Sequence, residues 1–165
     1  MLDAHAARPG GAGAGALSSR RPMTDLVLPD SGAPAAHFHF PVRVYWEDTD
    51  AGGIVFYANY LKFFERARTE WLRALGHSQQ EMVDTTGCMF VVQDTHVRYL
   101  RPARLDDVLV VTVHVRERGR ASLRIAQQAW RDGTLLAEGD IRIGCVERAT
   151  LKPQRIPGPI SEALE

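Results

Sequence analysis

The sequence has few cysteines, no net charge and no long apolar run, which argues against a disulfide-stabilised, a nucleic-acid-binding or a membrane-spanning protein. Only two of its 165 residues are cysteine, which is too few for a disulfide framework and favours a reducing compartment. Twenty basic residues balance twenty acidic ones without a basic block, so the charge pattern does not favour nucleic-acid binding. No apolar run approaches the length that spans a bilayer. We therefore expect a cytoplasmic protein without nucleic-acid binding or membrane insertion.

Residues 1–36 lack the periodic apolar residues of a folded segment and are rich in glycine, alanine, proline and serine. Such a composition buries too little surface to offset the entropy that ordering costs. The residues after the Arg20-Arg21 pair include prolines and aspartates, which interrupt the apolar core that a secretory signal requires. We predict a flexible arm over 1–36, one domain over 37–155 and a C-terminal tail over 156–165.

The rest of the chain combines one helix pattern with several strand patterns. The strand-like runs are 37–46, 89–100, 107–118, 121–130 and 134–147. Alternation predicts two buried faces in the later runs, one of Leu109, Val111, Val113 and Val115, the other of Leu135, Ala137, Gly139, Ile141, Ile143 and Cys145. Asp132-Gly133 is a strong signal for a two-residue hairpin between the last two runs. The order of elements predicts an α+β domain whose helix packs on one face of an antiparallel sheet.

The clearest expected element is an amphipathic helix between Asn59 and Gly76. Its apolar residues recur at steps of three and four, whereas the charged residues lie largely on other faces. The apolar residues are Tyr60 or Leu61, Phe64, Ala67, Trp71 and Leu75. Asn59 is a suitable N-cap, and Gly76 fits the left-handed position after the last turn.

A short acidic loop with two glycines runs directly into this helix. Glu47, Asp48 and Asp50 lie within four residues, which first suggests a cation site. An EF-hand loop starting at Asp48 would need Asp or Asn in place of Gly52 and Glu in place of Asn59. A magnesium-dependent phosphoryl site would need a phosphate cradle or further ligands, and the sequence has neither. We expect no metal, which leaves a structural turn or a catalytic loop.

The arrangement of the loop favours catalysis. Gly52 and Gly53 let the backbone approach a ligand closely, and Ile54–Asn59 lead to the helix N-terminus. Unpaired N–H groups and the helix dipole favour developing negative charge there. A carboxylate on one side and amide donors on the other suit attack on an acyl carbonyl whose oxyanion the amides hold. Acyl transfer is the reaction class that this loop predicts.

Several separated motifs also resemble a known family. Arg43-Val44, Thr49-Asp50, Gly53-Ile54-Val55 and Tyr60 resemble the signature of the 4-hydroxybenzoyl-CoA thioesterase family of hotdog-fold enzymes. The run Val44–Arg73, together with Ser78–Gln80, Phe90–Val92 and Pro102–Asp107, is similar to the tol-pal-associated, YbgC-type branch of that family. The resemblance covers residues 38–155, which is nearly all of the predicted domain.

The resemblance implies a hotdog fold, an antiparallel sheet wrapped around the long helix, and a homodimer or homotetramer with sheets joined edge to edge. It implies hydrolysis of an acyl-CoA thioester without metal or redox cofactor, and an acyl carrier protein remains an alternative carrier. By position, Asp50 is the nucleophile or the general base, and the backbone N–H of Tyr57 polarises the thioester carbonyl. The substrate-binding positions that it implies are Gly53, Ile54, Val55, Arg120 and Ser122, the last two toward CoA.

Tyr57 departs from the YbgC-type branch, many of whose members carry histidine at this position. A phenol is a much weaker base than imidazole near neutral pH, so the amide role survives while the acyl preference stays open. A hotdog dehydratase would need a catalytic histidine near a carboxylate, and none lies between Val44 and Gly76. A non-enzymatic acyl-CoA-binding protein, or a scaffold of the envelope machinery, is the alternative function.

Overall fold

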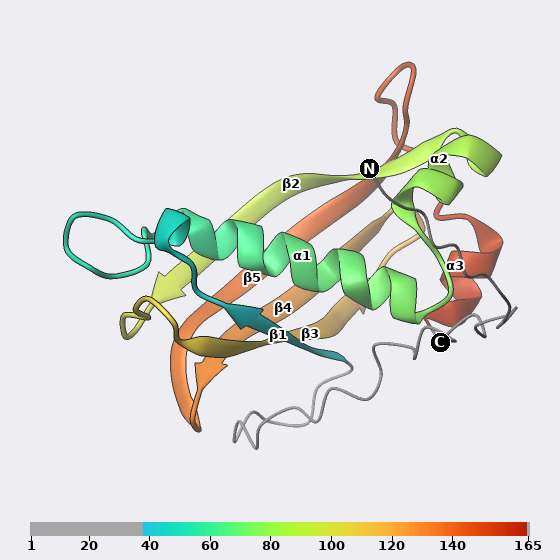
Figure 1. Ribbon diagram of the computed structural model, residues 1–165. Helices are drawn as coiled ribbons and strands as arrows, with labels where there is room; N and C mark the ends of the chain where they lie inside the picture. Colours follow the sequence, from blue (N-terminus) through green and yellow to red (C-terminus); the bar gives the residue numbers. More distant parts are fainter. Residues whose placement is uncertain (1–37, 165) are drawn as a thin grey trace, which may run out of the picture.

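The computed structural model describes residues 38–164 and places a five-stranded antiparallel sheet around one long helix (Figure 1). The strands are β1 (Phe38–Arg43), β2 (Cys88–Tyr99), β3 (Val108–Arg118), β4 (Ser122–Arg131) and β5 (Thr134–Glu147). They lie in the order β1-β3-β4-β5-β2. The predicted hotdog architecture is confirmed, whereas the predicted arm over 1–36 lies outside the described residues.

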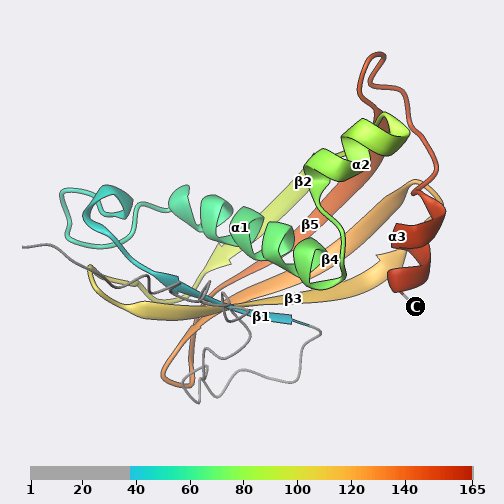
Figure 2. The ribbon, with the colours of Figure 1, turned by 45° about the vertical axis from the view of Figure 1, so that its right-hand side comes forward.

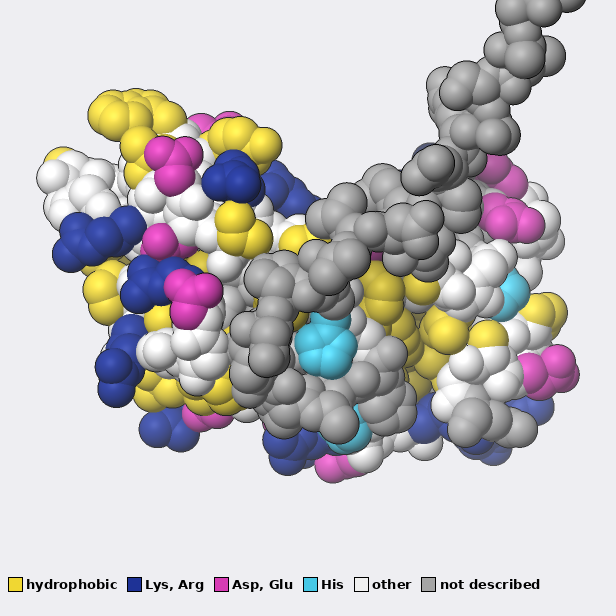
Figure 3. Space-filling model, turned by 60° about the horizontal axis from the view of Figure 1, so that its bottom comes forward, with side chains coloured by type: hydrophobic (Ala, Val, Ile, Leu, Met, Phe, Trp, Pro, Cys, Tyr) yellow, Lys and Arg dark blue, Asp and Glu magenta, His cyan; other side chains and the backbone are white. Residues whose placement is uncertain are grey.

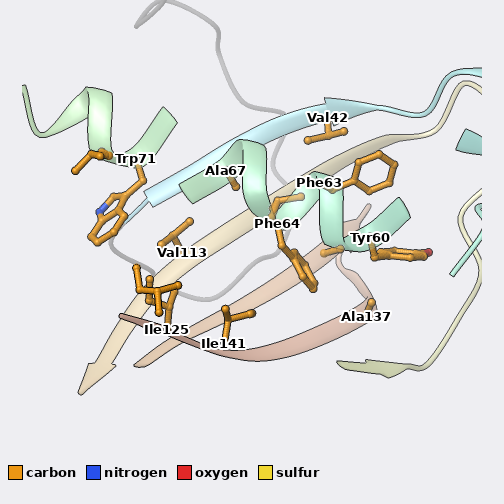
Figure 4. Close-up of a cluster of buried hydrophobic side chains, with 14 of the residues drawn as sticks. Val42, Tyr60, Phe63, Phe64, Ala67, Trp71, Val113, Ile125, Ala137 and Ile141 are labelled. Atoms are coloured by element: carbon orange, nitrogen blue, oxygen red, sulfur yellow. The ribbon is translucent and has the colours of Figure 1, made fainter. Parts of the chain in front are cut away.

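The long helix α1 (Asn59–Ala74) lies across one face of the curved sheet, as the views in Figures 1 and 2 show. Its buried residues are Asn59, Tyr60, Phe63, Phe64, Ala67, Trp71 and Leu72. Tyr60 is 3% exposed and Leu61 is 42% exposed, so Tyr60 is the residue that begins the buried stripe. Figure 4 shows the stripe above Val113, Ile125 and Ile141 of the sheet. Burial of this apolar surface is the main force that holds helix and sheet together.

One glycine of β5 sets how closely α1 approaches the sheet. A Cβ atom on Gly139 would lie 2.8 Å from Cε2 of Phe64 and 3.0 Å from Cδ1 of Ile141. Phe64 itself is fully buried. The ring therefore rests on bare backbone, in space that a larger residue at position 139 would fill.

The two ends of α1 differ in how well the sequence predicted them. At the C-terminal end, Gly76 has a φ of +87°. Its N–H donates to Arg73 O at 2.9 Å and the His77 N–H donates to Leu72 O at 3.1 Å, which is the Schellman arrangement. At the N-terminal end the prediction of Asn59 as N-cap is wrong. Asn59 is the first helical residue, and its side chain bonds to the preceding loop instead of to the helix.

Shorter elements and one register shift also depart from the predictions. The structure adds α2 (Gln79–Thr86), α3 (Gly158–Ala163) and the 3-10 helix η2 (Trp46–Asp48). These helices are too short for their hydrophobic periodicity to be recognised in the sequence.

The register of the pairing between β4 and β5 shifts by one residue between Ala129 and Trp130 of β4. As a result Leu136 is fully buried and the predicted core residue Leu135 is only half-buried. The other predicted residues of that face, from Ala137 to Cys145, are buried.

The sheet has two edges within the described part of the chain, β1 and β2. Pro41 lies in β1, an edge strand, which is where a sheet tolerates proline. Asp132 and Gly133, with φ of +47° and +72°, form the predicted tight hairpin between β4 and β5. The 12-residue β2 is the longer edge, and all of its residues are half-buried or exposed.

The Cys145 thiol lies fully buried in the core, and burial raises its pKa to about 12, with the neighbouring Cys88 thiol acting in the same direction. An unfolded thiol has a pKa near 9. At a pH between these two pKa values, the Cys145 thiol is deprotonated in the unfolded state and protonated in the native state. The contribution of Cys145 to stability is therefore complete below pH 9 and is lost as pH rises toward 12.

We expect the stability advantage of the wild type over Cys145→Ala to shrink above about pH 9, by at most about 1.4 kcal/mol per pH unit. Urea unfolding of both proteins between about pH 8 and about pH 11 measures this advantage. The tyrosines also titrate in this range, but they are common to both proteins and cancel in the difference. A constant difference over the whole range would contradict the prediction.

Candidate active site

The candidate site is built from the loop of residues 44–58, which projects at one end of the sheet and leads into α1 (Figure 1). Thr49 and Val55 form an antiparallel bridge that closes the tip of the loop. Within the tip, the Gly53 N–H donates to Asp50 O at 2.9 Å. Gly53 has a φ of +70°, a left-handed conformation that favours glycine. The loop is therefore a closed, hydrogen-bonded turn.

The three acidic residues of the loop have different environments. The Asp48 side chain is 1% exposed and accepts the Tyr45 N–H at 2.9 Å, so its role is structural. Glu47 is exposed and its carboxylate has no bond to any described residue. Asp50 is exposed, and its Oδ1 accepts the Gly52 N–H at 2.8 Å. Its Oδ2 bonds to none of residues 38–164, so one carboxylate oxygen is held and the other is open to a ligand.

The backbone just before α1 has two unused donors. Four nearby amides are engaged: Val55 N–H to Ala103 O (2.9 Å), Phe56 N–H to Asp48 O (2.8 Å), Asn59 N–H to Phe56 O (2.8 Å) and Leu61 N–H to Ala58 O (3.1 Å). By contrast, the N–H groups of Tyr57 and Ala58 donate to no residue that the structure describes. They lie where the positive end of the helix dipole favours an oxyanion.

Aromatic side chains surround these amides. The Tyr57 ring is 61% exposed and lies 4.6 Å from the Phe56 ring and 6.1 Å from the Tyr99 ring, measured between centroids. Tyr99 in turn lies 5.6 Å from Tyr60. Burial raises the pKa of Tyr60, and burial together with Tyr57 raises the pKa of Tyr99, so both remain neutral phenols at neutral pH. The rings of Phe56, Tyr57, Tyr60 and Tyr99 therefore form a neutral aromatic cluster beside the start of α1.

Sequence reasoning did not find Tyr99 as a part of the site. It ends β2, and only the sheet topology brings it to the start of α1. No local pattern marks it. Ala103 likewise holds the loop from outside, through its carbonyl to Val55 and its N–H to the Tyr60 hydroxyl oxygen at 3.2 Å.

The predicted substrate-binding residues divide into two groups. Ile54 is next to Asp50, since Ile54 O accepts the Asp50 N–H at 2.9 Å, whereas Val55 is 4% exposed and belongs to the core. Arg120 and Ser122 lie at the turn between β3 and β4, at the opposite end of the sheet. The eleven residues of β3 separate the two ends by roughly 30 Å. One chain therefore does not bring Arg120 and Ser122 to its own Asp50.

The described residues offer no cluster for a metal ion, since no three His, Cys, Asp or Glu side chains gather among residues 38–164. None of the helices in that range is long and apolar enough to cross a bilayer. Figure 3 shows Lys and Arg side chains mixed with Asp and Glu on the face that it presents. This mixture agrees with the balanced charge of the sequence.

The loop, the helix start and the hotdog sheet also agree with what known proteins show. A family model described as the thioesterase-like superfamily matches residues 44–164. The chain belongs to this superfamily. Acyl-CoA thioesterase YbgC of Haemophilus influenzae is 42% identical over 127 residues, which cover 77% of this chain and 93% of that protein. Acyl-CoA thioester hydrolase YbgC of Escherichia coli O6:H1 is 43% identical over 124 residues, which cover 74% of this chain and 92% of that protein.

A solved structure supports the same membership in the thioesterase-like superfamily. A probable thioesterase from Bartonella henselae superposes with a TM-score of 0.71 at 31% identity, and the match covers 74% of this chain and 100% of that chain. The family resemblance in the sequence is thus confirmed. So is the enzyme class that it implied, a thioester hydrolase.

Proposed function

We propose that this thioesterase hydrolyses acyl-CoA to a free acid and CoA, with Asp50 as the reacting carboxylate and the Tyr57 amide as the oxyanion donor. The observation that supports the proposal most is the pairing of an exposed carboxylate with unused amides seven residues later, at the start of α1. The relatives that carry the name YbgC are acyl-CoA thioesterases, which supports CoA as the carrier. No metal or redox cofactor enters the proposal.

The amide and the carboxylate have complementary tasks in this mechanism. The thioester carbonyl oxygen accepts the Tyr57 N–H, which stabilises the negative charge that forms on it, an effect of about 3 kcal/mol for one donor. Asp50 either attacks the carbonyl carbon or takes a proton from an attacking water. In both routes the C–S bond breaks and CoA leaves as the thiolate, which takes up a proton released by the hydrolytic water. In the first route water then hydrolyses the acyl-aspartyl anhydride.

We propose that the enzyme is a homo-oligomer in which a second copy covers the open edge at β2. That strand is 12 residues long and carries Val92, which is 53% exposed, and long open edges favour pairing. The separation of roughly 30 Å along β3 means that Arg120 and Ser122 could contact CoA only at the site of another copy.

With two cysteines and no charge pattern for a membrane surface, we assign the reaction to the cytoplasm.

A hydrolysis panel tests the proposal. Purified full-length protein is assayed with acyl-CoA thioesters of graded chain length and with aromatic acyl-CoAs, using Asp50→Asn as the blank. A parallel arm offers the same acyl groups on an acyl carrier protein. Turnover of at least one CoA substrate that the blank lacks is the expected result. No turnover with any member of the panel would favour the non-enzymatic binding or scaffold function.

A further inference from the structure

Asn59 is a buried polar residue at the junction between the acidic loop and α1. It is 7% exposed, and its Nδ2 donates to Asp48 O at 3.0 Å and, at the longer distance of 3.5 Å, to Glu47 O. Asp48 O also accepts the Phe56 N–H at 2.8 Å. A single side chain of the helix therefore holds the backbone of the loop.

The place of Asn59 in the chain relates it to both reacting groups. The carbonyl that it holds belongs to Asp48, two residues before Asp50, and Asn59 itself lies two residues after Tyr57. Its side chain thus joins the segment that carries the carboxylate to the segment that carries the amide. Small errors in the geometry of reacting groups cost large factors in rate, since a displacement of about 1 Å can lower the rate about 100-fold.

We propose that Asn59 is a positioning residue for thioester hydrolysis, which fixes the Asp50 loop against the amides at the start of α1. The inference rests on the proposed function of Asp50 and Tyr57. Asn59 does not touch the substrate. Its amide must donate, because both of its partners are carbonyl oxygens. Aspartate at this position has the same size but, when ionised, has no donor.

The expected result is a loss of kcat without a matching change in KM. We expect Asn59→Leu and Asn59→Asp to lower kcat about 10-fold or more while KM stays within about twofold, since orientation and not ground-state binding is lost. Asn59→Ser, a small residue that keeps a hydroxyl donor, should fall between wild type and Asn59→Leu. If Asn59→Leu and Asn59→Asp do not fold, the kcat of Asn59→Ser alone tests the inference.

A matched control separates positioning from stability. Gln127 is fully buried, and its Nε2 donates to Phe64 O of the same helix at 2.9 Å, away from the loop. Gln127→Leu should lower the melting temperature at least as much as Asn59→Leu and leave kcat within about twofold of wild type. Equal losses of kcat in these two variants, or wild-type kcat in all Asn59 variants, would overturn the inference.

The proposed function is tested separately within the same experiment. Asp50→Asn is assayed beside the Asn59 variants on the same acyl-CoA. If Asp50→Asn keeps wild-type turnover, the assignment of the reacting carboxylate is wrong and the positioning inference fails with it. If Asp50→Asn is inactive while the Asn59 variants turn over normally, only the positioning inference fails.

Discussion

Asp50→Asn should lower kcat about 100-fold or more on every acyl-CoA that the protein hydrolyses, and the fold should persist. Asparagine can act neither as a carboxylate nucleophile nor as a base toward water. The change is mild for the structure, because Asp50 is exposed and its side chain has one bond within the described residues, accepted from the Gly52 N–H. The side-chain oxygen of asparagine can accept the same bond. Steady-state kinetics, with circular dichroism as a check of the fold, measures both expectations.

Glu47→Gln is the matched control for this prediction. It removes an exposed carboxylate from the same loop, three residues before Asp50. The Glu47 side chain bonds to none of the residues described. We expect its kcat to stay within about twofold of wild type, because the charge of an exposed carboxylate is hydrated and screened by salt. Wild-type turnover of Asp50→Asn on every cleaved substrate would contradict the assignment, and an equal loss in Glu47→Gln would point to the charge of the loop instead.

A single turnover in heavy-oxygen water tests whether Asp50 acts as the nucleophile. Attack by the carboxylate forms an anhydride, and its hydrolysis at the aspartyl carbon leaves the label in the protein. Activation of water by the carboxylate places the label in the released acid alone. Mass spectrometry of the peptide that contains Asp50 detects a mass increase in the first case and none in the second.

Phe64→Ala should lower the free energy of unfolding by about 3–5 kcal/mol. Phe64 is fully buried at the centre of α1, between the helix and β5. Truncation removes the apolar contacts of the ring and leaves a cavity that the rigid sheet cannot close. Since a domain of this size is stable by about 5–15 kcal/mol, the variant should unfold at much lower urea concentration, at an unchanged m-value.

Leu61→Ala is the control on the same helix. Leu61 is 42% exposed, so its truncation should change stability by less than about 1 kcal/mol. Equal effects of the two substitutions would show that burial against the sheet does not decide the stability of α1. A loss below about 1 kcal/mol for Phe64→Ala would contradict the prediction directly.

The sequence predicts those parts of the fold that local patterns encode. The five strand-like runs of the sequence coincide with the five strands, and Asp132-Gly133 marks the turn between β4 and β5. The neighbourhood of Asp50 and the helix start is also predictable, because both belong to one continuous stretch of chain. Tyr99 is different, since it reaches the site only through the place of β2 in the sheet.

The predictions that failed share one physical cause. Asn59 has the side chain of an N-cap, but tertiary structure offers it the carbonyl of Asp48, and it forms that bond instead. Leu135 fits the alternation, but the register shift opposite Trp130 gives the buried position to Leu136. In both cases a contact with another segment of the chain decided the outcome, and not the local pattern. The roles of Asp50, Tyr57, Arg120 and Ser122 remain predictions.

The close approach of Phe64 to Gly139 constrains how the sequence of this domain can diverge. A side chain at position 139 would need the space that the ring occupies. Alanine at position 139 therefore becomes acceptable only after position 64 has lost its ring, and restoring the ring then requires the glycine again. The two positions, 75 residues apart in the sequence, should covary among related chains, and the order in which they change is restricted as well.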